Sequence, residues 1–426
     1  MNRTNSTPGR PSSVARGSIA AGAVAVSVAA LWTSWLVTEL AGPLTASGHH
    51  DFLALYAAAT LVHTGSASHL YDASSITAIE RAIYPHPTGY AGYMPFLNPP
   101  AAAALLSPLA LLTETSARFL WLGVALLVAG LGIASVIRQR TSWIVVGSVI
   151  LVLLFTFPAY QTLVEGQWSY VMVLGSLLAL RLSDAGRQEW AGIALVVLWL
   201  KPPLFALVLL WLLCNRRWRM AGAAVAAVAV VTLAALPWTG VDANLHYFSY
   251  LLNVSATNAA GGGAAGATAW EGSFANMEGL LGLAAAIVGQ NHPVAVDILT
   301  LVLAAGVAGV LVWSMRGHWG RPLPLRLGVA ALLVGLLLDP HLYAQDCLLL
   351  VVPAALVAWR LQLGAGWWFA VAAVMNLAAI DTLWSQQLFP LPLHLLTIAM
   401  VATVFVLCLP APWFFRQMDN LRPAAA

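Results

Sequence analysis

The chain has 426 residues, of which 60% are hydrophobic and only 8% are charged, and its formal net charge is +3. Soluble globular proteins carry about 25% charged residues, so this composition excludes an ordinary soluble domain and indicates a polytopic membrane protein. Cys214, Cys347 and Cys408 lie far apart in or beside apolar runs, a spacing that fits neither a metal site nor a disulfide framework.

The N-terminal part of the chain predicts a retained membrane span followed by a large polar loop. A polar tail over residues 1–17 precedes an apolar run over 18–37. That run is long enough to cross a bilayer and longer than the apolar region of a cleaved signal peptide. The loop extends over residues 39–115 and contains amphipathic pieces. Its last part, 101–112, is interrupted by Pro108 and is too short for a span, so we expect a half-inserted or interfacial helix there.

Apolar runs along the rest of the chain predict further spans. They lie at 116–137, 142–158, 167–182, 190–200, 203–214, 219–237, 294–315, 326–339, 344–360, 366–382 and 391–411. Several of these runs are shorter than the roughly 20 residues of a straight crossing. The two runs that flank Lys201 can also be interpreted as one kinked span; the distribution of basic residues favours two.

Basic and acidic residues are predicted to lie on opposite sides of the membrane. If the N-terminus is cytoplasmic, all of the 19 basic residues except Arg81, Arg118 and Lys201 fall on the cytoplasmic side, as the positive-inside rule expects. Most acids and histidines then fall on the extracytoplasmic side. The sequence therefore predicts one transmembrane domain over 18–411, followed by a cytoplasmic tail over 412–426.

A second large extracytoplasmic segment is expected over residues 238–293. It contains a stretch rich in glycine and alanine at 258–269, a composition typical of flexible segments. This stretch is interpreted either as a lid that closes over a substrate or as a mobile connector. No internal repeat of the kind found in transporters is evident.

The first loop begins with His49, His50 and Asp51. Asp51 has two interpretations. It is either an interfacial acid that caps a helix beginning at Phe52, or a general base whose pKa is raised toward a useful range by partial desolvation. His50 is expected to orient the carboxylate or to bind an anion.

Lys201 is the only lysine of the chain and lies between two apolar runs, directly before two prolines. Ionisable groups inside a membrane are costly and suggest a function, and a lysine is a compact charge suited to a phosphate group. The alternative is a lysine that extends to the membrane surface.

Two interruptions of apolar sequence predict polar groups that face a pocket. The segment 339–346 contains Pro340, which breaks a helix, and such breaks are tolerated only where they line a cavity or are buried in protein. We expect His341, Tyr343, Gln345 and Asp346 to face this pocket. Glu165-Gly166-Gln167 is a shorter break of the same kind, where Gln167 is placed to hydrogen-bond a sugar hydroxyl or a phosphate.

The ordered set of motifs resembles glycosyltransferase family 87. The matching residues are Asp51-Phe52, Tyr56, Leu70-Tyr71-Asp72, Asn98-Pro99-Pro100, Gly166-Gln167, Lys201-Pro202, Arg216-Arg217-Trp218-Arg219 and Pro340-His341 with Asp346. No glycine-rich phosphate loop, metal-ligand spacing or nucleophile elbow is present in the sequence.

The resemblance implies an all-α, polytopic membrane protein with a GT-C-type fold, about 12 transmembrane helices and extracytoplasmic loop helices. It also implies an inverting glycosyltransferase in a bacterial plasma membrane. Such an enzyme moves a sugar from a polyprenyl-phosphate donor to a glycolipid or glycan acceptor on the extracytoplasmic face, without a cofactor, a metal ion or nucleic acid. The expected sugar is mannose, with arabinose or another hexose as alternatives.

Each candidate residue has an expected role in this reaction. Asp51 is the expected catalytic base. Donor-phosphate binding is assigned to Lys201, His341, Gln167 and Tyr343, and substrate binding to His50, Tyr56, Asn98 and Asp346. A transporter or lipid flippase is the alternative function, because broken helices with ionisable residues also bind substrates in transporters. A family member that has lost catalysis and serves as a scaffold is a third possibility.

Overall fold

A computed structural model describes most of the chain, over residues 50–85, 95–137, 142–260, 277–289, 292–318, 324–339, 341–381 and 393–409. Residues 26, 27, 30 and 31 are also described, and for 251–260 only the backbone is. Most of the predicted first span, both predicted tails, His49, Pro340 and most of the stretch rich in glycine and alanine lie outside these ranges.

Every regular element in the described ranges is a helix, which confirms the predicted all-α class. The α-helices and 3-10 helices (η) are, in order, α2 (Asp51–His63), η1 (Ala67–His69), α3 (Ala73–Ile83), α4 (Pro100–Leu106), η2 (Ser107–Leu111), α5 (Glu114–Val136), α6 (Trp143–Leu154), α7 (Phe157–Glu165), α8 (Ser169–Asp184), α9 (Gln188–Ala194), η3 (Leu195–Leu200), α10 (Pro202–Cys214), α11 (Trp218–Ala260), α12 (Leu280–Val288), α13 (Pro293–Met315), α14 (Leu325–Leu337), η5 (Ala344–Leu350), α15 (Val351–Leu361), α16 (Ala365–Met375) and α18 (Leu395–Cys408).

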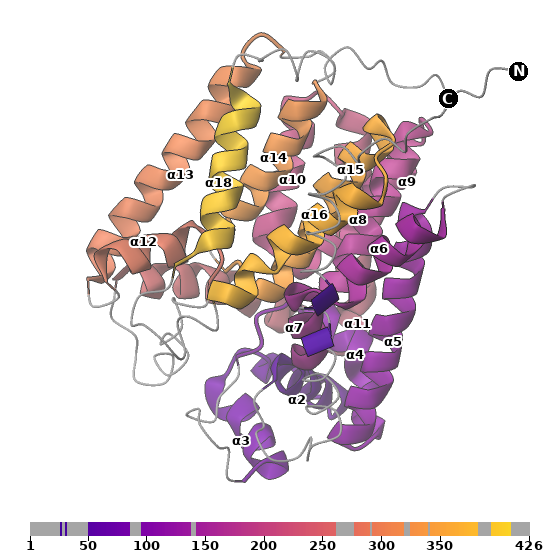
Figure 1. Cartoon of the computed structure of the whole chain (residues 1–426). Helices are drawn as coiled ribbons and strands as arrows, with labels where there is room; N and C mark the ends of the chain where they lie inside the picture. The colour runs from indigo at the N-terminus through magenta and orange to yellow at the C-terminus, as the bar shows by residue number, and fades with distance from the viewer. Residues whose placement is uncertain are drawn as a thin grey trace, which may run out of the picture.

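The helices form a bundle with a smaller layer at one end. Figure 1 shows α5, α13, α14 and α18 running along the long direction of the bundle, with α2 and α3 together below it. The polar loop predicted to follow the first span therefore folds into short helices of its own, which close one end of the bundle.

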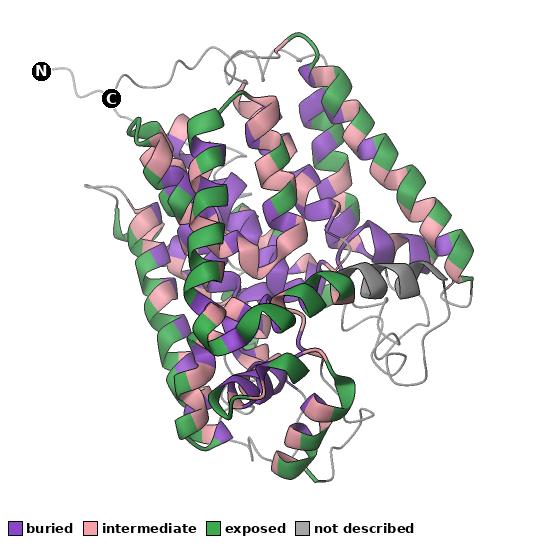
Figure 2. Cartoon of the chain, turned by 180° about the vertical axis from the view of Figure 1, so that it is seen from behind, coloured by how far each residue is buried: buried purple, intermediate pink, exposed green. Residues whose placement is uncertain are grey.

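Four described helices are long and apolar enough to cross a membrane, and the number rises to five if one bent pair is counted as a span. The four are 114–136, 218–250, 293–315 and 344–361. The outer faces of α5, α11 and α13 are mostly exposed (Figure 2) and carry residues such as Leu127 and Leu301, which a lipid bilayer covers in a membrane protein. The chain is thus a multi-pass membrane protein, but the predicted number of about 12 spans is not confirmed within the described ranges.

The predicted span over 142–158 divides into two helices. α6 ends at Leu154, α7 begins at Phe157, and their axes differ by 49°. Pro158 occupies the first turn of α7. Proline has no N–H for an intrahelical hydrogen bond, so it is accepted at the start of a helix and not in its interior. α7 itself is a helix that the sequence did not predict.

α9 with η3 and α10 form a hairpin with Lys201 at its turn. Arg219, at the start of α11 just after α10, pairs with Glu189 at the start of α9 at 2.5 Å. The chain therefore returns to the end from which it came, which supports two segments instead of one kinked span. α10 has 13 residues and rises about 20 Å, less than the roughly 30 Å hydrocarbon core, so the turn lies within the depth of the bundle.

The end of this hairpin opposite Lys201 is rich in arginine. Arg360 pairs with Asp184 at 2.5 Å, Arg217 donates to the Ser183 hydroxyl at 2.7 Å, and the Arg181 guanidinium lies 5.2 Å from the Trp359 ring centroid. Arginines that the sequence assigned to separate cytoplasmic segments are thus brought to a common end of the bundle.

Helical structure of α11 continues into the segment over 238–293 that is predicted to be extracytoplasmic. The helix continues past Pro237 to Ala260, with one break at Gly240, whose φ is 70° and ψ is 168°. Thr239 and Asn244 donate to the carbonyls of Ala235 and Gly240 at 3.1 and 2.8 Å. These side chains accordingly satisfy backbone carbonyls beside the break, where the chain bends between two helical segments.

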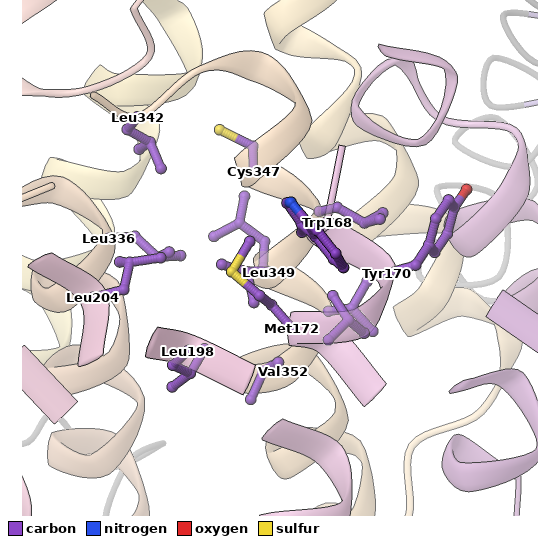
Figure 3. Close-up of a cluster of buried hydrophobic side chains, with 14 of the residues drawn as sticks. Trp168, Tyr170, Met172, Leu198, Leu204, Leu336, Leu342, Cys347, Leu349 and Val352 are labelled. Atoms are coloured by element: carbon purple, nitrogen blue, oxygen red, sulfur yellow. The ribbon is translucent and has the colours of Figure 1, made fainter. Parts of the chain in front are cut away.

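An apolar core lies directly beside the turn at Lys201. Figure 3 shows Leu198 and Leu204, on either side of Lys201 in sequence, with Leu342, Cys347 and Leu349 from the segment that contains Asp346. Trp168 and Met172 of the loop and helix after Gln167 belong to the same cluster. Polar residues at these breaks therefore lie against an apolar core.

Candidate functional site

The first residue of α2 is Asp51, and its carboxylate faces the break between α7 and α8. The Gln167 side-chain amide donates a short hydrogen bond to Asp51 Oδ2. The backbone N–H of Asp51 donates to Glu165 Oε2 at 3.2 Å. Asp51 is thus joined on two sides to the segment 165–167, which is more than 110 residues away in sequence.

Gly166 allows this close approach between α2 and the break. Its φ is 70°, and an added Cβ would lie 2.7 Å from Cβ of Phe52. The Gly166 carbonyl accepts a hydrogen bond from the Trp121 indole N–H at 2.7 Å. A residue without a side chain is therefore required where Gln167 meets Asp51.

Gly166→Ala is expected to reduce activity by moving Asp51 away from Gln167. The added methyl group pushes against Phe52, next to Asp51, and displacement of a reacting group by about 1 Å costs about 100-fold in rate. The matched control is Gly186→Ala, since Gly186 also has a positive φ (74°) but no atom within 4 Å of an added Cβ. Thermal unfolding should show a loss of stability in both variants, larger in Gly166→Ala because of the contact with Phe52, and turnover measurements a loss of activity in Gly166→Ala alone. Equal turnover would contradict this role for Gly166.

Lys201 lies at the turn between η3 and α10 and is surrounded by acceptors from the segment 339–346. Its Nζ pairs closely with Asp346 Oδ2, lies 3.9 Å from Asp339 Oδ2 and donates to the His341 carbonyl at 3.2 Å. The side chain of Lys201 is 20% exposed, whereas those of Asp339 and Asp346 are 2% and 1% exposed. The lysine therefore does not extend to the surface.

Asp346 has one oxygen left for another partner. Its Oδ2 also accepts the Tyr343 backbone N–H at 3.1 Å, while its Oδ1 is buried and accepts no hydrogen bond within the described ranges. Buried polar atoms are normally paired, and a carboxylate accepts hydrogen bonds from hydroxyl groups. This oxygen is suited to a sugar hydroxyl.

Asp51 and the Lys201 cluster belong to one electrostatic unit. Desolvation, the largest effect, raises the pKa of the Asp51 carboxyl above its ordinary value of 3.8, and the Asp346 charge raises it further. The hydrogen bond from Gln167 and the Lys201 charge lower the pKa, but the net result is an increase. One lysine thus faces three carboxyl groups, those of Asp51, Asp339 and Asp346, so its positive charge is already offset in the free protein.

His341 lies beside this cluster as a neutral group. Burial, followed by the charge of Lys201, lowers the pKa of its imidazole to about 4. At neutral pH His341 therefore cannot add positive charge next to a phosphate, but a neutral imidazole still offers one N–H donor.

The other predicted site residues hold the surrounding elements. The Asn98 amide donates to the Leu200 carbonyl at 2.9 Å, just before Lys201, and the Tyr56 hydroxyl donates to the Leu112 carbonyl at 2.7 Å. His50 Nε2 lies 3.5 Å from Glu114 Oε1, and the Tyr343 ring packs against the buried cluster around Met277. In the structure Asn98, Tyr56 and His50 thus contact the elements that surround the site.

Sequence reasoning missed four residues that contact the site. Glu165 and Asp339 occur inside the predicted breaks, and the breaks themselves were the signal that could have identified them. Arg118 and Trp121 lie inside an apolar run, where nothing but the unusual position of an arginine draws attention to them. No group of three or more histidine, cysteine, aspartate or glutamate residues in the described ranges is arranged to hold a metal ion.

Residues 96–340, more than half of the chain, match the family described as Glycosyltransferase family 87. The chain belongs to glycosyltransferase family 87. This confirms the family predicted from the ordered motifs. The matched range contains Gln167, Lys201 and Asp339, whereas Asp51 and Asp346 lie outside it, so their place in the family 87 site depends on the contacts described above.

The chain also resembles the alpha-(1->3)-arabinofuranosyltransferase of Mycobacterium tuberculosis, in strains CDC 1551 / Oshkosh and ATCC 25618 / H37Rv. Each is 35% identical over 149 residues, which cover 33% of this chain and 34% of the relative. The chain thus aligns with about a third of the length of these relatives. No solved structure matches the chain significantly.

Proposed function

We propose that the chain is a membrane glycosyltransferase that moves a sugar from a polyprenyl-phosphate donor to a glycolipid or glycan acceptor, with inversion at the anomeric carbon. Membership of family 87 and the printed name of the relatives support glycosyl transfer. The observation that carries the proposal is that two pairs from four distant segments of the chain, Asp51–Gln167 and Lys201–Asp346, lie close enough for their charges to interact. It joins a candidate base to a candidate cation.

Asp51 is the proposed general base. Its free carboxylate oxygen removes the proton from the acceptor hydroxyl as that oxygen attacks the anomeric carbon of the donor. The Gln167 amide holds the other oxygen, Oδ2, and so fixes the orientation of the carboxylate. General base catalysis contributes about 10²–10⁴-fold.

Lys201 is the proposed partner of the leaving phosphate. The bond between the anomeric carbon and the phosphate oxygen breaks, and its electron pair remains on the polyprenyl phosphate, whose negative charge increases from one to two. A preorganised cation stabilises such developing charge. Since Asp346 already pairs with Lys201, donor phosphate and Asp346 compete for the lysine, and Asp346 can turn a carboxylate oxygen to a sugar hydroxyl instead.

The site is proposed to face the extracytoplasmic side of a bacterial plasma membrane. Arg181, Arg217 and Arg360 gather at the end of the hairpin opposite Lys201, and cytoplasmic segments of membrane proteins are enriched in basic residues. Asp51 belongs to the layer of short helices at the other end of the bundle (Figure 1). A donor held in the outer leaflet would reach such a site from within the membrane.

The proposal is tested with the purified full chain in liposomes, an acceptor extract and a panel of donors. The panel contains polyprenyl-phosphate mannose, polyprenyl-phosphate arabinofuranose and the corresponding nucleotide sugars. We expect transfer from at least one lipid-linked donor, a product of inverted anomeric configuration and no transfer from nucleotide sugars. Transfer from nucleotide sugars alone, or from no donor, would contradict the proposal. The relatives' name makes arabinofuranose a necessary part of the panel beside mannose.

A further inference from the structure

One face of α5 carries three side chains that are unusual in an apolar span. Glu114, Arg118 and Trp121 occupy positions i, i+4 and i+7 of this helix, which place them on one face. Glu114 and Trp121 are 6% and 7% exposed, while Phe119 and Leu120 between them are exposed on another face. We call Glu114, Arg118 and Trp121 the α5 stripe.

Each member of the α5 stripe contacts a segment that leads into the site. Glu114 Oε1 lies 3.5 Å from Nε2 of His50, the residue before Asp51. Arg118 donates to the Val164 carbonyl at 3.0 Å. Trp121 donates to the carbonyl of Gly166, the residue before Gln167, at 2.7 Å.

Further contacts fix both ends of the stripe. The Tyr84 hydroxyl donates to Glu114 Oε2 at 3.1 Å, and the Trp121 ring lies edge-on to Trp168 with their centroids 4.7 Å apart. Trp168 follows Gln167 directly, so Trp121 contacts residues on both sides of Gln167. Side-chain contacts therefore fix the positions of Glu114 and Trp121 at the two ends of the stripe.

Arg118 has a clear electrostatic reason to be here. The last carbonyls of a helix lack intrahelical partners and carry partial negative charge, which favours a cation. Val164 lies in the last turn of α7, which ends at Glu165. This explains why Arg118 departs from the predicted cytoplasmic location of basic residues.

We propose that the α5 stripe is a positioning device that sets the geometry of the Asp51–Gln167 pair. α5 contacts His50, just before Asp51, and hydrogen-bonds Gly166, just before Gln167, and so places the two partners relative to one rigid helix. The proposal rests on the proposed role of Asp51 as the base. The three residues of the α5 stripe act through Asp51 and Gln167, without touching the reacting atoms.

Trp121→Phe is the test, because it removes the N–H donated to Gly166 and keeps an aromatic ring. We expect kcat to fall about 10- to 100-fold, as for a slightly misplaced reacting group, with the KM for the lipid-linked donor unchanged. The matched control is Trp359→Phe. Trp359 is also 7% exposed and donates its indole N–H to the Val136 carbonyl at 3.0 Å, at the opposite end of the same helix.

The comparison separates positioning from general stability. Both substitutions should lower the unfolding temperature by similar amounts, whereas kcat should fall in Trp121→Phe alone. Equal kcat in the two variants would overturn the proposal. If Trp121→Phe fails to fold, Arg118→Lys replaces it. Lysine keeps the charge at Val164 but lacks the planar fork of arginine, so we expect a lower kcat with an unchanged KM for the donor. An unchanged kcat would overturn the proposal.

Failure of this inference can be told apart from failure of the proposed function. If Asp51→Asn loses turnover while Trp121→Phe and Arg118→Lys keep it, the base stands and the stripe is refuted. If Asp51→Asn keeps turnover, the proposed function of Asp51 fails, whatever the stripe variants do.

Discussion

Replacing Asp51 with asparagine is expected to lower the rate of sugar transfer by about 10²–10⁴-fold, the usual contribution of a general base. Asparagine has the same shape and can still present an oxygen to the Gln167 amide, so the contact between α2 and the break at Gly166 is retained. It cannot accept a proton from the acceptor hydroxyl. Donor binding should remain close to that of the unchanged protein, since the proposed phosphate partner is Lys201.

The matched control for this substitution is Asp72→Asn. Asp72 lies in the same loop region, but its carboxylate is exposed and pairs with His69 at 2.6 Å. Transfer should be unaffected in this variant. Initial rates from a lipid-linked donor and binding of labelled donor are the two measurements. Full transfer activity in Asp51→Asn would falsify the assignment of the base.

The pH dependence of transfer gives a second measurement on Asp51. The base acts in its ionised form, and desolvation together with the Asp346 charge outweighs the opposing effects of Gln167 and Lys201, so its pKa lies above 3.8. Activity should therefore fall as the pH is lowered through this raised pKa, at a higher pH than an ordinary aspartate would give. In Gln167→Leu, which removes a hydrogen bond that lowers the pKa, the acidic limb should move to still higher pH.

The structure brings together segments that the sequence indicated for different reasons. The breaks at 165–167 and 339–346 selected Gln167 and Asp346, because polar groups at such breaks are tolerated only where they line a cavity or are buried in protein. Asp51 was selected as the acid that opens the first loop, and Lys201 as an ionisable group between two apolar runs. These arguments did not predict that Asp346 pairs with Lys201. Pairing between residues 145 positions apart depends on how α14, η5 and the hairpin turn pack, which local sequence does not specify.

The helix boundaries were predicted less well, for reasons that particular residues make clear. Composition indicated an apolar run over 142–158, but a new helix begins at Phe157, with Pro158 in its first turn, at a 49° angle to the helix before it. The span predicted over 219–237 ends at a proline, yet helical structure continues past Pro237 with a break at Gly240. Thr239 and Asn244 hydrogen-bond the carbonyls of Ala235 and Gly240 beside this break. A proline thus lies in the first turn of one helix and inside another, so proline alone does not fix a helix boundary.

The charge balance at Lys201 limits how the donor can bind. The lysine is enclosed by Asp346 and Asp339, so a donor phosphate adds a negative charge to a cluster that already contains more acids than cations. Binding is favourable only if the phosphate replaces a carboxylate as the partner of Lys201 or if a carboxyl group takes up a proton. The affinity for donor should therefore depend on both residues. Loss of the Lys201 charge should lower this affinity, and loss of the Asp346 charge should raise it.

Replacing Lys201 with methionine is expected to cause the largest loss of stability among the substitutions considered. Removing one partner of a buried ion pair costs about 3–5 kcal/mol, and here it leaves Asp346, whose side chain is 1% exposed, without its cation. Donor binding should be lost as well. Thermal unfolding of the detergent-solubilised chain and binding of labelled lipid-linked donor measure the two effects.

The loss of stability and the loss of donor binding separate in a double variant. In Lys201→Met with Asp346→Asn the closest ion pair is removed as a whole, and asparagine still offers an oxygen to the Tyr343 backbone N–H, so part of the stability should return. Asp339, which lies 3.9 Å from the lysine Nζ in the unchanged protein, still lacks its cation in this variant. Donor binding should stay lost, because the phosphate has no cation. Asp346→Asn alone removes the competing carboxylate and should bind donor more tightly than the unchanged protein. A double variant that binds donor normally would exclude Lys201 from the phosphate site and leave its pair with Asp346 as a purely structural contact.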